Sequence, residues 1–510
     1  MLQKFEEHGN RTAIVDNKSN RSYTFHQLCS SITNFGSSLL RRGFKPQDVL
    51  AVILPNVPEY PVVIYGTSAI GGIVTTMNPR YTEYELIHQL QDSGATYIIT
   101  IPESADRVKT VSAKLGINNL FVIGEAEGFE AFSRLLDDDG SMFQMYEPTD
   151  WKDEVVFLLY SSGTTGLPKG VMVTHYNAIA YTTMASNFTS LSRGKQEGIM
   201  LGLSPMYHSY GIKVVLGLGL YLGYKIVCVD RFELETFLKT VQDYKVNHSS
   251  HYCTAYSSIA LLKHPDISKF DLTCVQGVLC GAAPLGEDVM EQLKTHFPQI
   301  DTVRQGYGLT EMATVMITPP DGMGKPGSVG VPMPNLQVKV IDLQTGALLG
   351  PGKDGEICFK GPTVMKGYLN KPEATADTID KDGWLHTGDV GHYDEDEHFF
   401  IVDRVKELIK YKGFQVPPAE LEDILLSHPQ ITDAAVIGIP DQEAGELPKA
   451  FVVTQDTLTE KEIFSFVAEK VVPYKKLRGG IEFVDKIPKS PSGKILRRVL
   501  KEQEKAKRKI

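Results

Sequence analysis

Short apolar segments alternate with amphipathic segments along most of this 510-residue chain, and this alternation limits the possible folds more than any other feature. The first unit is typical. Thr24-Phe25-His26-Gln27 is a capping box that opens an amphipathic helix, and Gly43 can end that helix. Val49–Leu54 follows as an apolar strand that Pro55 stops. Strands that alternate with helices pack as a parallel sheet covered by helices, so the sequence predicts an α/β fold.

The same pattern recurs further along the chain. The strands expected in the first half are Thr96–Thr100, Asn119–Ile123, Val155–Leu159, Lys225–Val229 and Val275–Cys280, with a helix at Phe232–Tyr244. Near Gly350 the sequence pattern changes to short apolar segments, Gly355–Lys360 and Phe399–Val402, separated by Gly, Pro and Asp. This change predicts a small β subdomain at the end of a large N-terminal domain of parallel-rich sheets flanked by helices.

The pattern resets after Asp403. A helix at Pro418–Ser427, a strand at Asp433–Ile439 and a helix at Glu460–Val471 predict a small α+β C-terminal domain. We therefore divide the chain into a large domain, residues 1–402, and a small, mobile one, residues 403–510.

Composition excludes several classes of protein. Lys and Arg number 52 against 62 Asp and Glu, and the net charge of −10 excludes a protein built mainly to hold nucleic acid. With 42% hydrophobic and 22% charged residues, most of the chain must be folded. The N-terminus carries Glu6 and Glu7 where a signal peptide needs an apolar core, and Lys213 and Lys225 interrupt the most apolar run, so no transmembrane segment is expected.

Cysteine and histidine spacing gives no sign of a metal or disulfide framework. The six cysteines form no C-x-x-C pair and the thirteen histidines form no H-E-x-x-H motif. A reducing compartment is the better match. The last three residues, Arg508-Lys509-Ile510, differ from the peroxisomal signal Ser-Lys-Leu at their first and last positions. We expect a cytoplasmic location and keep a peroxisomal one as the alternative.

The stretch from Tyr160 to Gly170 is the most informative one. It places four hydroxyl side chains, three glycines and Lys169 directly after an apolar strand. Glycines let backbone N–H groups converge on phosphate oxygens, hydroxyls add donors, and lysine adds a positive charge. The stretch is not a Walker A loop, because Pro168 and Gly170 stand where that motif needs Gly and Ser or Thr. It predicts a phosphate-binding loop of another kind, and a flexible surface loop is the alternative.

A second cluster runs from Gln305 to Glu311. Its glycines do not form the dinucleotide fingerprint G-x-G-x-x-G, because Glu311 occupies the sixth position, and Gly217-Leu218-Gly219 fails the same test at Leu222. The cluster still offers a backbone that a flat ligand can approach closely. Thr310 and Glu311 supply oxygen ligands suited to Mg²⁺ beside a polyphosphate. An ordinary strand-and-turn is the alternative.

Five motifs occur in the order found in the adenylate-forming superfamily. They are the two clusters above, Trp384–Asp389, Asp403–Glu422 and Pro488–Arg498. The chain resembles acyl-CoA synthetases over nearly its whole length, most closely the 4-coumarate-CoA ligase-like and firefly-luciferase-like branch. The resemblance implies two half-reactions. A carboxylic acid and Mg-ATP form an acyl-adenylate with release of pyrophosphate, and the thiol of coenzyme A then takes the acyl group and leaves AMP.

The resemblance also implies a nucleotide site. It assigns the β and γ phosphates to Ser161, Ser162, Gly163, Thr164, Thr165 and Lys169. It places adenine and the adenylate at Ala282, Gln305, Gly306 and Tyr307, and phosphate and metal at Thr310 and Glu311. Asp389 fits a ribose anchor, because a carboxylate can accept from both hydroxyls, and Arg404 can donate to the same sugar.

Two lysines of the small domain serve the two half-reactions in related enzymes. Lys494 would lie between the negative carboxylate and the negative triphosphate and offset their repulsion. Rotation about a hinge at residues 403–406, which include Lys406, would then bring Lys410 and Gln415 to the adenylate. Lys412 and Gly413 would line the path of coenzyme A, and Arg231 would meet its phosphates.

The acid would lie beside His208, as a gate or a carboxylate contact. The expected acyl-pocket residues are Tyr210, Gly281, Met312 and Val331. Residues 247–254 are polar where relatives carry an apolar pocket wall, so the sequence leaves open an aryl-propenoic or a medium- to long-chain fatty acid. Another acceptor, such as a carrier-protein thiol or the oxygen of luciferase-type oxidation, and a non-catalytic nucleotide-binding protein are the alternatives. The sequence does not predict an oligomeric state.

Overall fold

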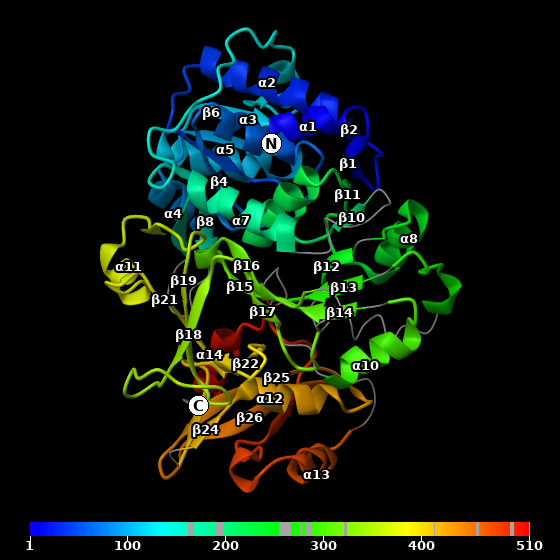
Figure 1. The fold of residues 1–510 in the computed structure, drawn as a ribbon, viewed down its shortest axis with the longest axis vertical. Coiled ribbons are helices and arrows are strands. Elements are labelled where there is room, and N and C mark those ends of the chain that lie inside the picture. The colour runs from blue at the N-terminus through cyan, green and yellow to red at the C-terminus, as the bar shows by residue number, and fades with distance from the viewer. Residues whose placement is uncertain are drawn as a thin grey trace.

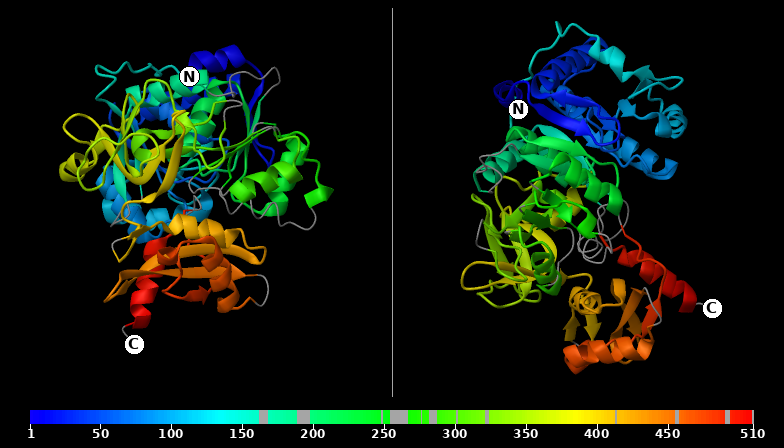
Figure 2. Two further views of the ribbon diagram at one scale, coloured as in Figure 1. Left: turned by 60° about the horizontal axis from the view of Figure 1, so that its bottom comes forward. Right: turned by 90° about the vertical axis from the view of Figure 1, so that its right-hand side faces the viewer.

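The computed structural model describes residues 1–161, 168–188, 198–247, 249–253, 267–275, 277–281, 287–300, 302–320, 324–412, 414–454, 458–489 and 494–508. Figure 1 shows a large body that contains the N-terminus and a smaller one, orange to red, that contains the C-terminal segment. The two further views show the same division (Figure 2). Among the described residues, no helix combines the length and apolar character that a membrane-spanning segment needs.

An eight-stranded sheet forms the first layer of the large body. Its order is β20-β9-β8-β4-β3-β5-β6-β7, and the six strands from β8 to β7 run parallel. In chain order the strands are β3 (Val49–Val52), β4 (Ile73–Thr76), β5 (Tyr97–Thr100), β6 (Asn119–Val122), β7 (Glu130–Ala131), β8 (Val155–Ser161), β9 (Lys169–Thr174) and β20 (Gly367–Tyr368). The helices of this region are α1 (Leu2–His8), α2 (Phe25–Arg41), α3 (Tyr60–Ala69), α4 (Glu83–Ser93), α5 (Pro102–Leu115), α6 (Phe132–Leu136) and α11 (Pro372–Thr378). The parallel-rich sheet expected from the sequence is confirmed.

Helix α2 forms as its sequence predicts. The Gln27 backbone N–H donates to Thr24 Oγ1 at 3.2 Å, and the Thr24 backbone N–H donates to Gln27 Oε1 at 2.8 Å, so the capping box is complete. Leu28, Ile32 and Phe35 recur at helical spacing and are fully buried. Burial of each such side chain stabilises the fold by roughly 1.5–3 kcal/mol.

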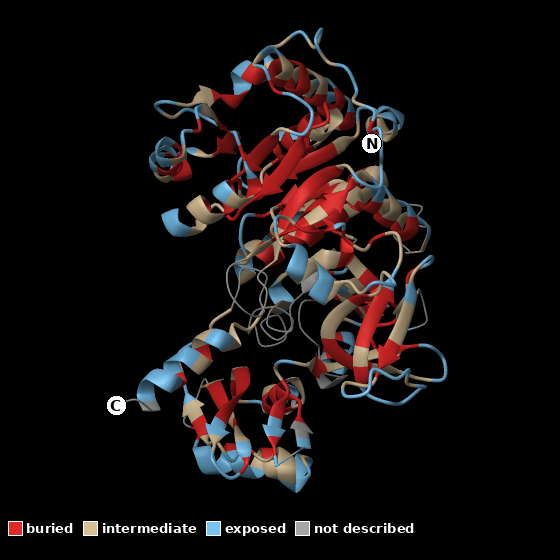
Figure 3. Ribbon diagram, turned by 90° about the vertical axis from the view of Figure 1, so that its left-hand side faces the viewer, coloured by how far each residue is buried: buried red, intermediate tan, exposed pale blue. Residues whose placement is uncertain are grey.

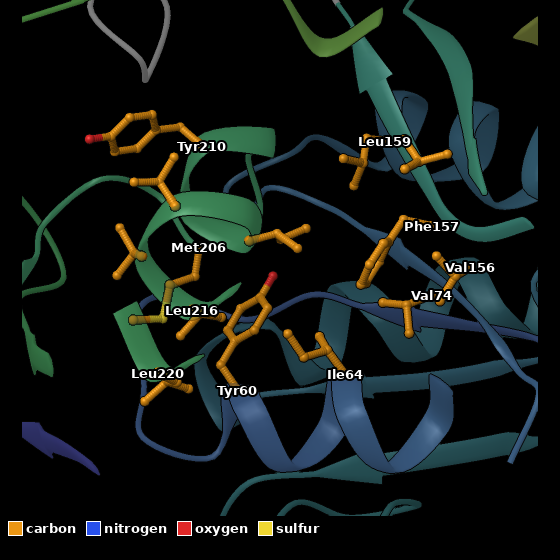
Figure 4. Packing of buried hydrophobic residues seen from close by; sticks show 14 of the residues in the cluster. Tyr60, Ile64, Val74, Val156, Phe157, Leu159, Met206, Tyr210, Leu216 and Leu220 are labelled. Atoms are coloured by element: carbon orange, nitrogen blue, oxygen red, sulfur yellow. The ribbon is translucent and has the colours of Figure 1, made fainter. Parts of the chain in front are cut away.

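Two smaller sheets follow. One has the order β10-β11-β1-β2, and the other is the parallel sheet β12-β13-β14. Their strands are β1 (Thr12–Asp16), β2 (Ser22–Thr24), β10 (Ile199–Gly202), β11 (Lys225–Cys228), β12 (Ser249–Cys253), β13 (Gly277–Cys280) and β14 (Thr302–Gln305). The associated helices are α7 (His175–Phe188), the π-helix η2 (Gly211–Gly219), α8 (Leu234–Tyr244), the 3-10 turn η3 (Ile267–Lys269) and α10 (Glu287–His296). Helix η2 packs against α3 and β8 through a continuous apolar core (Figure 4).

The predicted β subdomain is present. A four-stranded antiparallel sheet has the order β18-β19-β21-β22, and a three-stranded sheet β15-β16-β17 precedes it along the chain. The elements are β15 (Tyr307–Leu309), the 3-10 turn η4 (Thr310–Met312), β16 (Thr314–Thr318), β17 (Val331–Pro332), β18 (Gln337–Ile341), β19 (Gly355–Lys360), β21 (Leu385–Tyr393) and β22 (Phe399–Arg404). The strand predicted over 355–360 matches β19 residue for residue.

The small body contains a five-stranded sheet, β24-β23-β26-β25 with β27 beside β26. Its elements are β23 (Ile409–Tyr411), β24 (Phe414–Val416), α12 (Pro418–Leu426), β25 (Ile431–Asp441), β26 (Gly445–Thr454), α13 (Glu460–Lys470), the 3-10 turn η5 (Pro473–Lys475), β27 (Ile481–Phe483) and α14 (Arg497–Arg508). Its apolar residues between 409 and 500 pack into two clusters of their own. Buried strands lie inside both bodies and exposed helix faces lie outside (Figure 3).

Candidate active site

The end of β8 and the start of β9 approach a carboxylate from a distant segment. Ser161 and Lys169 are cross-strand partners in the β8–β9 pair. The Ser161 hydroxyl donates to Glu311 Oε1 at 2.8 Å, and the Tyr368 hydroxyl donates to the same oxygen at 2.9 Å. The Lys169 Nζ atom lies 4.8 Å from the centre of the Tyr368 ring. Both glycine-rich clusters of the sequence, which the resemblance assigned to the phosphates and the metal, therefore meet at one place.

The hairpin that presents Glu311 has a tight backbone. A Cβ atom on Gly308 would lie 1.8 Å from the carbonyl oxygen of Thr314, so only glycine fits at this position. Ala313 and Thr314 have φ angles of 63° and 136°, which side chains with a Cβ rarely adopt. Such strained residues cost roughly 1–3 kcal/mol each and persist where the surrounding structure holds them. Both residues directly follow η4, the turn that carries Thr310 and Glu311.

Asp389 is held from two sides. It is 4% exposed and lies opposite Arg404 in the β21–β22 pair. Arg404 Nε is 3.0 Å from Asp389 Oδ1, and the Tyr307 hydroxyl donates to Asp389 Oδ2 at 2.6 Å. Burial raises the pKa of Asp389, while the charge of Arg404 and the hydrogen bond from Tyr307 lower it. The site is a buried, oriented carboxylate next to a guanidinium.

A further layer behind Asp389 was not predicted from the sequence. The Gly388 backbone N–H donates to Glu356 Oε1 at 2.9 Å, and the second oxygen of Glu356 lies 3.0 Å from His386 Nδ1. The Thr387 hydroxyl donates to the carbonyl of Ile357 at 2.7 Å. These contacts fix the turn that carries Asp389. They depend on the β19–β21 register, which no local pattern in the sequence reveals.

Lys494 reaches this site from the small body. Burial and, to a smaller extent, the charge of Arg404 lower its pKa to about 8, while the carboxylates Asp389, Glu407 and Glu311 act in the opposite direction. Lys494 is therefore close enough to interact with the charges carried by β21 and β22, by η4, and by the segment that joins the two bodies.

His208 belongs to the same group. Burial lowers its pKa to about 4, and the positive charge of Lys494 adds to this effect. The neighbouring Ser209 hydroxyl lies 3.4 Å from Thr310 Oγ1, which places this loop beside η4. The structure thus brings His208, Lys494 and Glu311 together from three separate parts of the chain.

The residues expected to act in a second step lie apart from this group. Lys410 and Gln415 are opposite each other in the β23–β24 hairpin, and Lys410 and Lys412 are exposed. Lys406 is exposed, and Arg231 is an exposed residue whose Nη2 atom lies 2.5 Å from Glu233 Oε1. None of the described side chains in this second set is brought to Asp389 in this structure.

The expected acyl-pocket residues lie on several elements. Tyr210, Gly281 and Met312 are buried, and Val331 is half-buried at the start of β17. Gln305 is buried at the end of β14, and the Gly306 backbone N–H donates to the carbonyl of Cys280 at 2.8 Å. Six predicted residues fall outside the described part of the chain: Ser162, Gly163, Thr164, Thr165, Ala282 and Gly413. Only the backbone of Gln415 is described.

Sequence reasoning also missed two side chains that bear on this site. Tyr368 donates to Glu311, although it belongs to β20, more than fifty residues further along the chain. Lys213 is 3% exposed, although the sequence suggested only that it interrupts an apolar run. A lysine inside such a run was the one available signal that something polar lies in this part of the core.

Comparison with known proteins identifies the family. The model of the AMP-binding enzyme family matches residues 2–369, and the model of the AMP-binding enzyme C-terminal domain matches residues 420–494. The chain is 41% identical to 4-coumarate–CoA ligase 1 of Petroselinum crispum, over 97% of this chain and 91% of that protein. It is 41% identical to luciferin 4-monooxygenase of Luciola mingrelica, over 93% of this chain and 87% of that protein.

A solved structure supports the same assignment. ATP-bound MatB from Rhodopseudomonas palustris is 26% identical and superposes with a TM-score of 0.88 over 99% of both chains. The apo form of the same protein gives a TM-score of 0.78, over 99% of this chain and 98% of that one. With both family models matched in order and full-length relatives near 40% identity, the chain belongs to the AMP-binding enzyme family.

Proposed function

We propose that the cluster of Lys494, His208, Glu311, Asp389 and Arg404 is the adenylation centre of an AMP-forming acid–thiol ligase. The enzyme activates a carboxylic acid with ATP as an acyl-adenylate and transfers the acyl group to coenzyme A. The observation that supports this assignment best is the half-buried position of Lys494 among the charges of Arg404, Asp389 and Glu311. A single ammonium held at such a place can lie between two anionic substrates.

Each described side chain has a part in this proposal. Asp389 accepts from the ribose hydroxyls, and Arg404, 3.0 Å away, orients that carboxylate and favours its ionised form. Ser161 and Lys169 lie where the leaving pyrophosphate needs hydrogen-bond donors and positive charge. Lys494 stabilises the charge that develops on the bridging oxygen as the carboxylate attacks the α phosphate. Neutral His208 would contact the carboxylate of the substrate.

The oxygen atoms near the phosphate loop fit a magnesium ion. Glu311 offers a carboxylate and Thr310 a hydroxyl, and Mg²⁺ prefers such hard oxygen ligands. When bound, the ion would neutralise part of the charge on the polyphosphate. Ser161, which donates to Glu311, would keep the carboxylate turned toward the phosphates.

We further propose that the chain divides between residues 402 and 403 and that the small domain turns after adenylation. The ATP-bound form of MatB superposes better than its apo form, which supports the view that this structure has the arrangement for the first half-reaction. Lys410 and Lys412 are exposed, and Gln415 lies opposite Lys410 in the β23–β24 hairpin, so a rotation of the whole small body can bring these residues to the adenylate with its core intact. Arg231 would then meet the phosphates of coenzyme A.

The acid is proposed to be an aryl-propenoic or a medium- to long-chain fatty acid. The 4-coumarate–CoA ligase relatives support the first class. Tyr210, Gly281, Met312 and Val331 would line the pocket, where Met312 suits an irregular hydrophobic ligand. Of the unusual polar segment 247–254, only Asn247 has a described side chain, and its Oδ1 atom accepts from the Ile199 backbone N–H at 2.8 Å.

A cytoplasmic location is also proposed. The five cysteines with described side chains, Cys29, Cys228, Cys274, Cys280 and Cys358, are free thiols. Free thiols are typical of a reducing compartment.

The test is pyrophosphate release by the purified protein with Mg-ATP and a panel of aryl-propenoic and fatty acids, each with and without coenzyme A. We expect acid-dependent release that coenzyme A converts into many turnovers. Lys494→Ala should lower release by about 10²–10³-fold, which is the usual loss when one stabilising donor is removed. Lys505→Ala, an exposed lysine on α14 of the same domain, is the matched control and should leave the rate unchanged.

The luciferase relative supports a second acceptor. Release that needs the acid but is indifferent to coenzyme A, together with light from added luciferin, would assign the adenylate to oxidation instead. Nucleotide binding without release under any acid would refute the ligase assignment.

A further inference from the structure

Lys213 is a positive side chain in an apolar interior. It is 3% exposed, and within the described part of the chain its Nζ atom has no hydrogen-bond partner. Its Nζ atom lies over the ring of Phe157, 4.5 Å from the ring centre. Burial lowers the pKa of Lys213 to about 7. An ammonium buried without an acceptor is unfavourable by several kcal/mol, so a reason for its presence is needed.

The helix that carries Lys213 begins at the candidate active site. The π-helix η2 starts directly after His208, Ser209 and Tyr210, and π-helices often occur at functional sites. Hydrogen bonds in a π-helix join residues five apart, so Lys213 lies about one turn beyond His208. The helix therefore leads from the place where the acid is activated into the core that Figure 4 shows.

Strand β8 shows how far Lys213 lies from the contact between Ser161 and Glu311. Side chains alternate along a strand, so Phe157 points to the same face as Leu159 and Ser161. Four residues of strand extend roughly 13 Å at about 3.3 Å per residue. Ser161 contacts Glu311 at one end, and Lys213 contacts Phe157 at the other. The span between these two contacts is suited to a rigid acid with its reacting carboxylate at the Ser161–Glu311 end of β8 and its far end near Lys213.

A second polar atom without a partner lies beside Lys213. The Nε2 atom of His175, the first residue of α7, is buried and has no hydrogen-bond partner in the described structure. Burial lowers the pKa of His175, the carboxylate of Glu154 opposes this effect and the charge of Lys213 adds to it, so both charged side chains lie near the His175 ring. Trp151 packs edge-on against the His175 ring, with 5.8 Å between ring centres. Thus neither of these two buried nitrogen atoms has a hydrogen-bond partner among the described residues.

We propose, on the basis of the function proposed above, that Lys213 and His175 bind a second carboxylate at the far end of the substrate. The preferred acid is a dicarboxylic acid of roughly aryl-propenoate length. A carboxylate has two oxygen atoms and can accept from the ammonium and from the imidazole N–H at once. It also supplies the negative charge that the buried ammonium lacks. Lys213 is thus a specificity-determining residue, and the unfavourable burial of its charge is offset only when the correct acid binds.

The experiment compares three acids that share one rigid frame: 4-carboxycinnamate, 4-hydroxycinnamate and 4-methylcinnamate. The kcat/KM of each is measured by pyrophosphate release with coenzyme A present. The wild type should prefer 4-carboxycinnamate over 4-methylcinnamate by at least about tenfold, as expected for a buried hydrogen bond to a charged group. Lys213→Met keeps the length of the side chain but removes the charge, and it should reverse this order.

The control is Lys225→Met, another lysine that lies over an aromatic ring, 5.1 Å from the centre of Tyr244. It should leave the order of the three acids unchanged. Lys213→Met should also raise the Tm of the substrate-free protein, because an unpaired buried charge is removed, and this measurement shows that the variant folds.

Three results would overturn the inference alone: a wild type that prefers 4-methylcinnamate, one that prefers 4-hydroxycinnamate over the diacid, or a Lys213→Met variant with the wild-type order. Each of them leaves acid activation intact. Absence of pyrophosphate release with every acid would instead refute the proposed function.

Discussion

The half-buried position of Lys494 beside Arg404 predicts an alkaline limit to the first half-reaction. A lysine ammonium is positive below its pKa and neutral above it, and burial lowers the pKa of Lys494 to about 8. If the charged form is needed for adenylation, kcat/KM for ATP should be constant up to about pH 7 and fall as pH rises through 8. His208, whose pKa is lowered to about 4, stays neutral over this range.

The size of the fall follows from the pKa. At pH 9 a lysine with a pKa near 8 is about 9% protonated, whereas one with an ordinary pKa of about 10.4 is about 96% protonated. We therefore expect a roughly tenfold loss of kcat/KM between pH 7 and pH 9. Because kcat/KM reports the free enzyme, the phosphates of bound ATP do not mask this pKa, while the kcat profile should be shifted to higher pH.

The assay is pyrophosphate release between pH 6 and pH 10 with an acid that has no second charged group. Lys494→Arg is the control, because arginine stays charged throughout this range. It should be less active but should lack the fall near pH 8. A wild-type kcat/KM that is constant to pH 9.5, or the same fall in Lys494→Arg, would refute the assignment of the charged lysine to adenylation.

Three further predictions follow from individual contacts. Asp389→Asn removes the carboxylate between Arg404 and Tyr307, and we expect the KM for ATP to rise by about ten- to a hundredfold, measured together with nucleotide affinity by calorimetry; an unchanged KM would exclude Asp389 as the ribose anchor. Gly308→Ala should destabilise the large domain by at least about 3 kcal/mol in urea unfolding, since its Cβ would lie 1.8 Å from the Thr314 oxygen. In Gly306→Ala the new Cβ would have its nearest contact at 3.3 Å, so the loss of unfolding free energy should be smaller, and equal losses in the two variants would contradict this reasoning. Arg497→Met leaves Glu407 and Glu422 without their cation, since these carboxylates lie 2.9 Å and 2.6 Å from the guanidinium. The variant should lower the free energy of unfolding of the small domain by about 3–5 kcal/mol. Calorimetry that shows only the large-domain transition affected would contradict this prediction.

Much of the fold follows from local signals in the sequence. The capping box at Thr24 and the hydrophobic spacing after it define α2 within two residues at its C-terminal end. The strand predicted at 355–360 matches β19 and the one predicted at 119–123 matches β6 to within one residue, because apolar runs bounded by Gly, Pro and Asp have few other possible structures. The predicted helix at 460–471 matches α13 to within one residue, where Thr459 forms another capping box.

The π-helical form of η2 could not be predicted in this way. A π-helix differs from an α-helix only in its hydrogen-bond spacing, and the run from Gly211 to Gly219 contains no marker for that choice. Long-range packing, and not local preference, decides between the α-helical and the π-helical form.

The candidate site was predictable where it rests on contiguous motifs. Asp389 and Arg404 were assigned to one sugar, and the structure places them 3.0 Å apart. The contact of Tyr368 with Glu311 and the support of Gly388 by Glu356 depend on which strands become neighbours, and single-sequence patterns carry no such information. Lys213 was visible as a charge in an apolar run, but its burial against Phe157 was not.

The most direct test of the central claim is to trap the intermediate. Radiolabelled ATP, the preferred acid and excess enzyme are mixed and quenched, and coenzyme A is added to half of each sample before the quench. We predict an acyl-adenylate that forms in the wild type, is nearly absent in Lys494→Ala, and is converted to acyl-CoA and AMP by coenzyme A. In Lys410→Ala the adenylate should form but persist after coenzyme A is added. An adenylate that forms normally without Lys494, or one that coenzyme A never consumes in the wild type, would contradict the account.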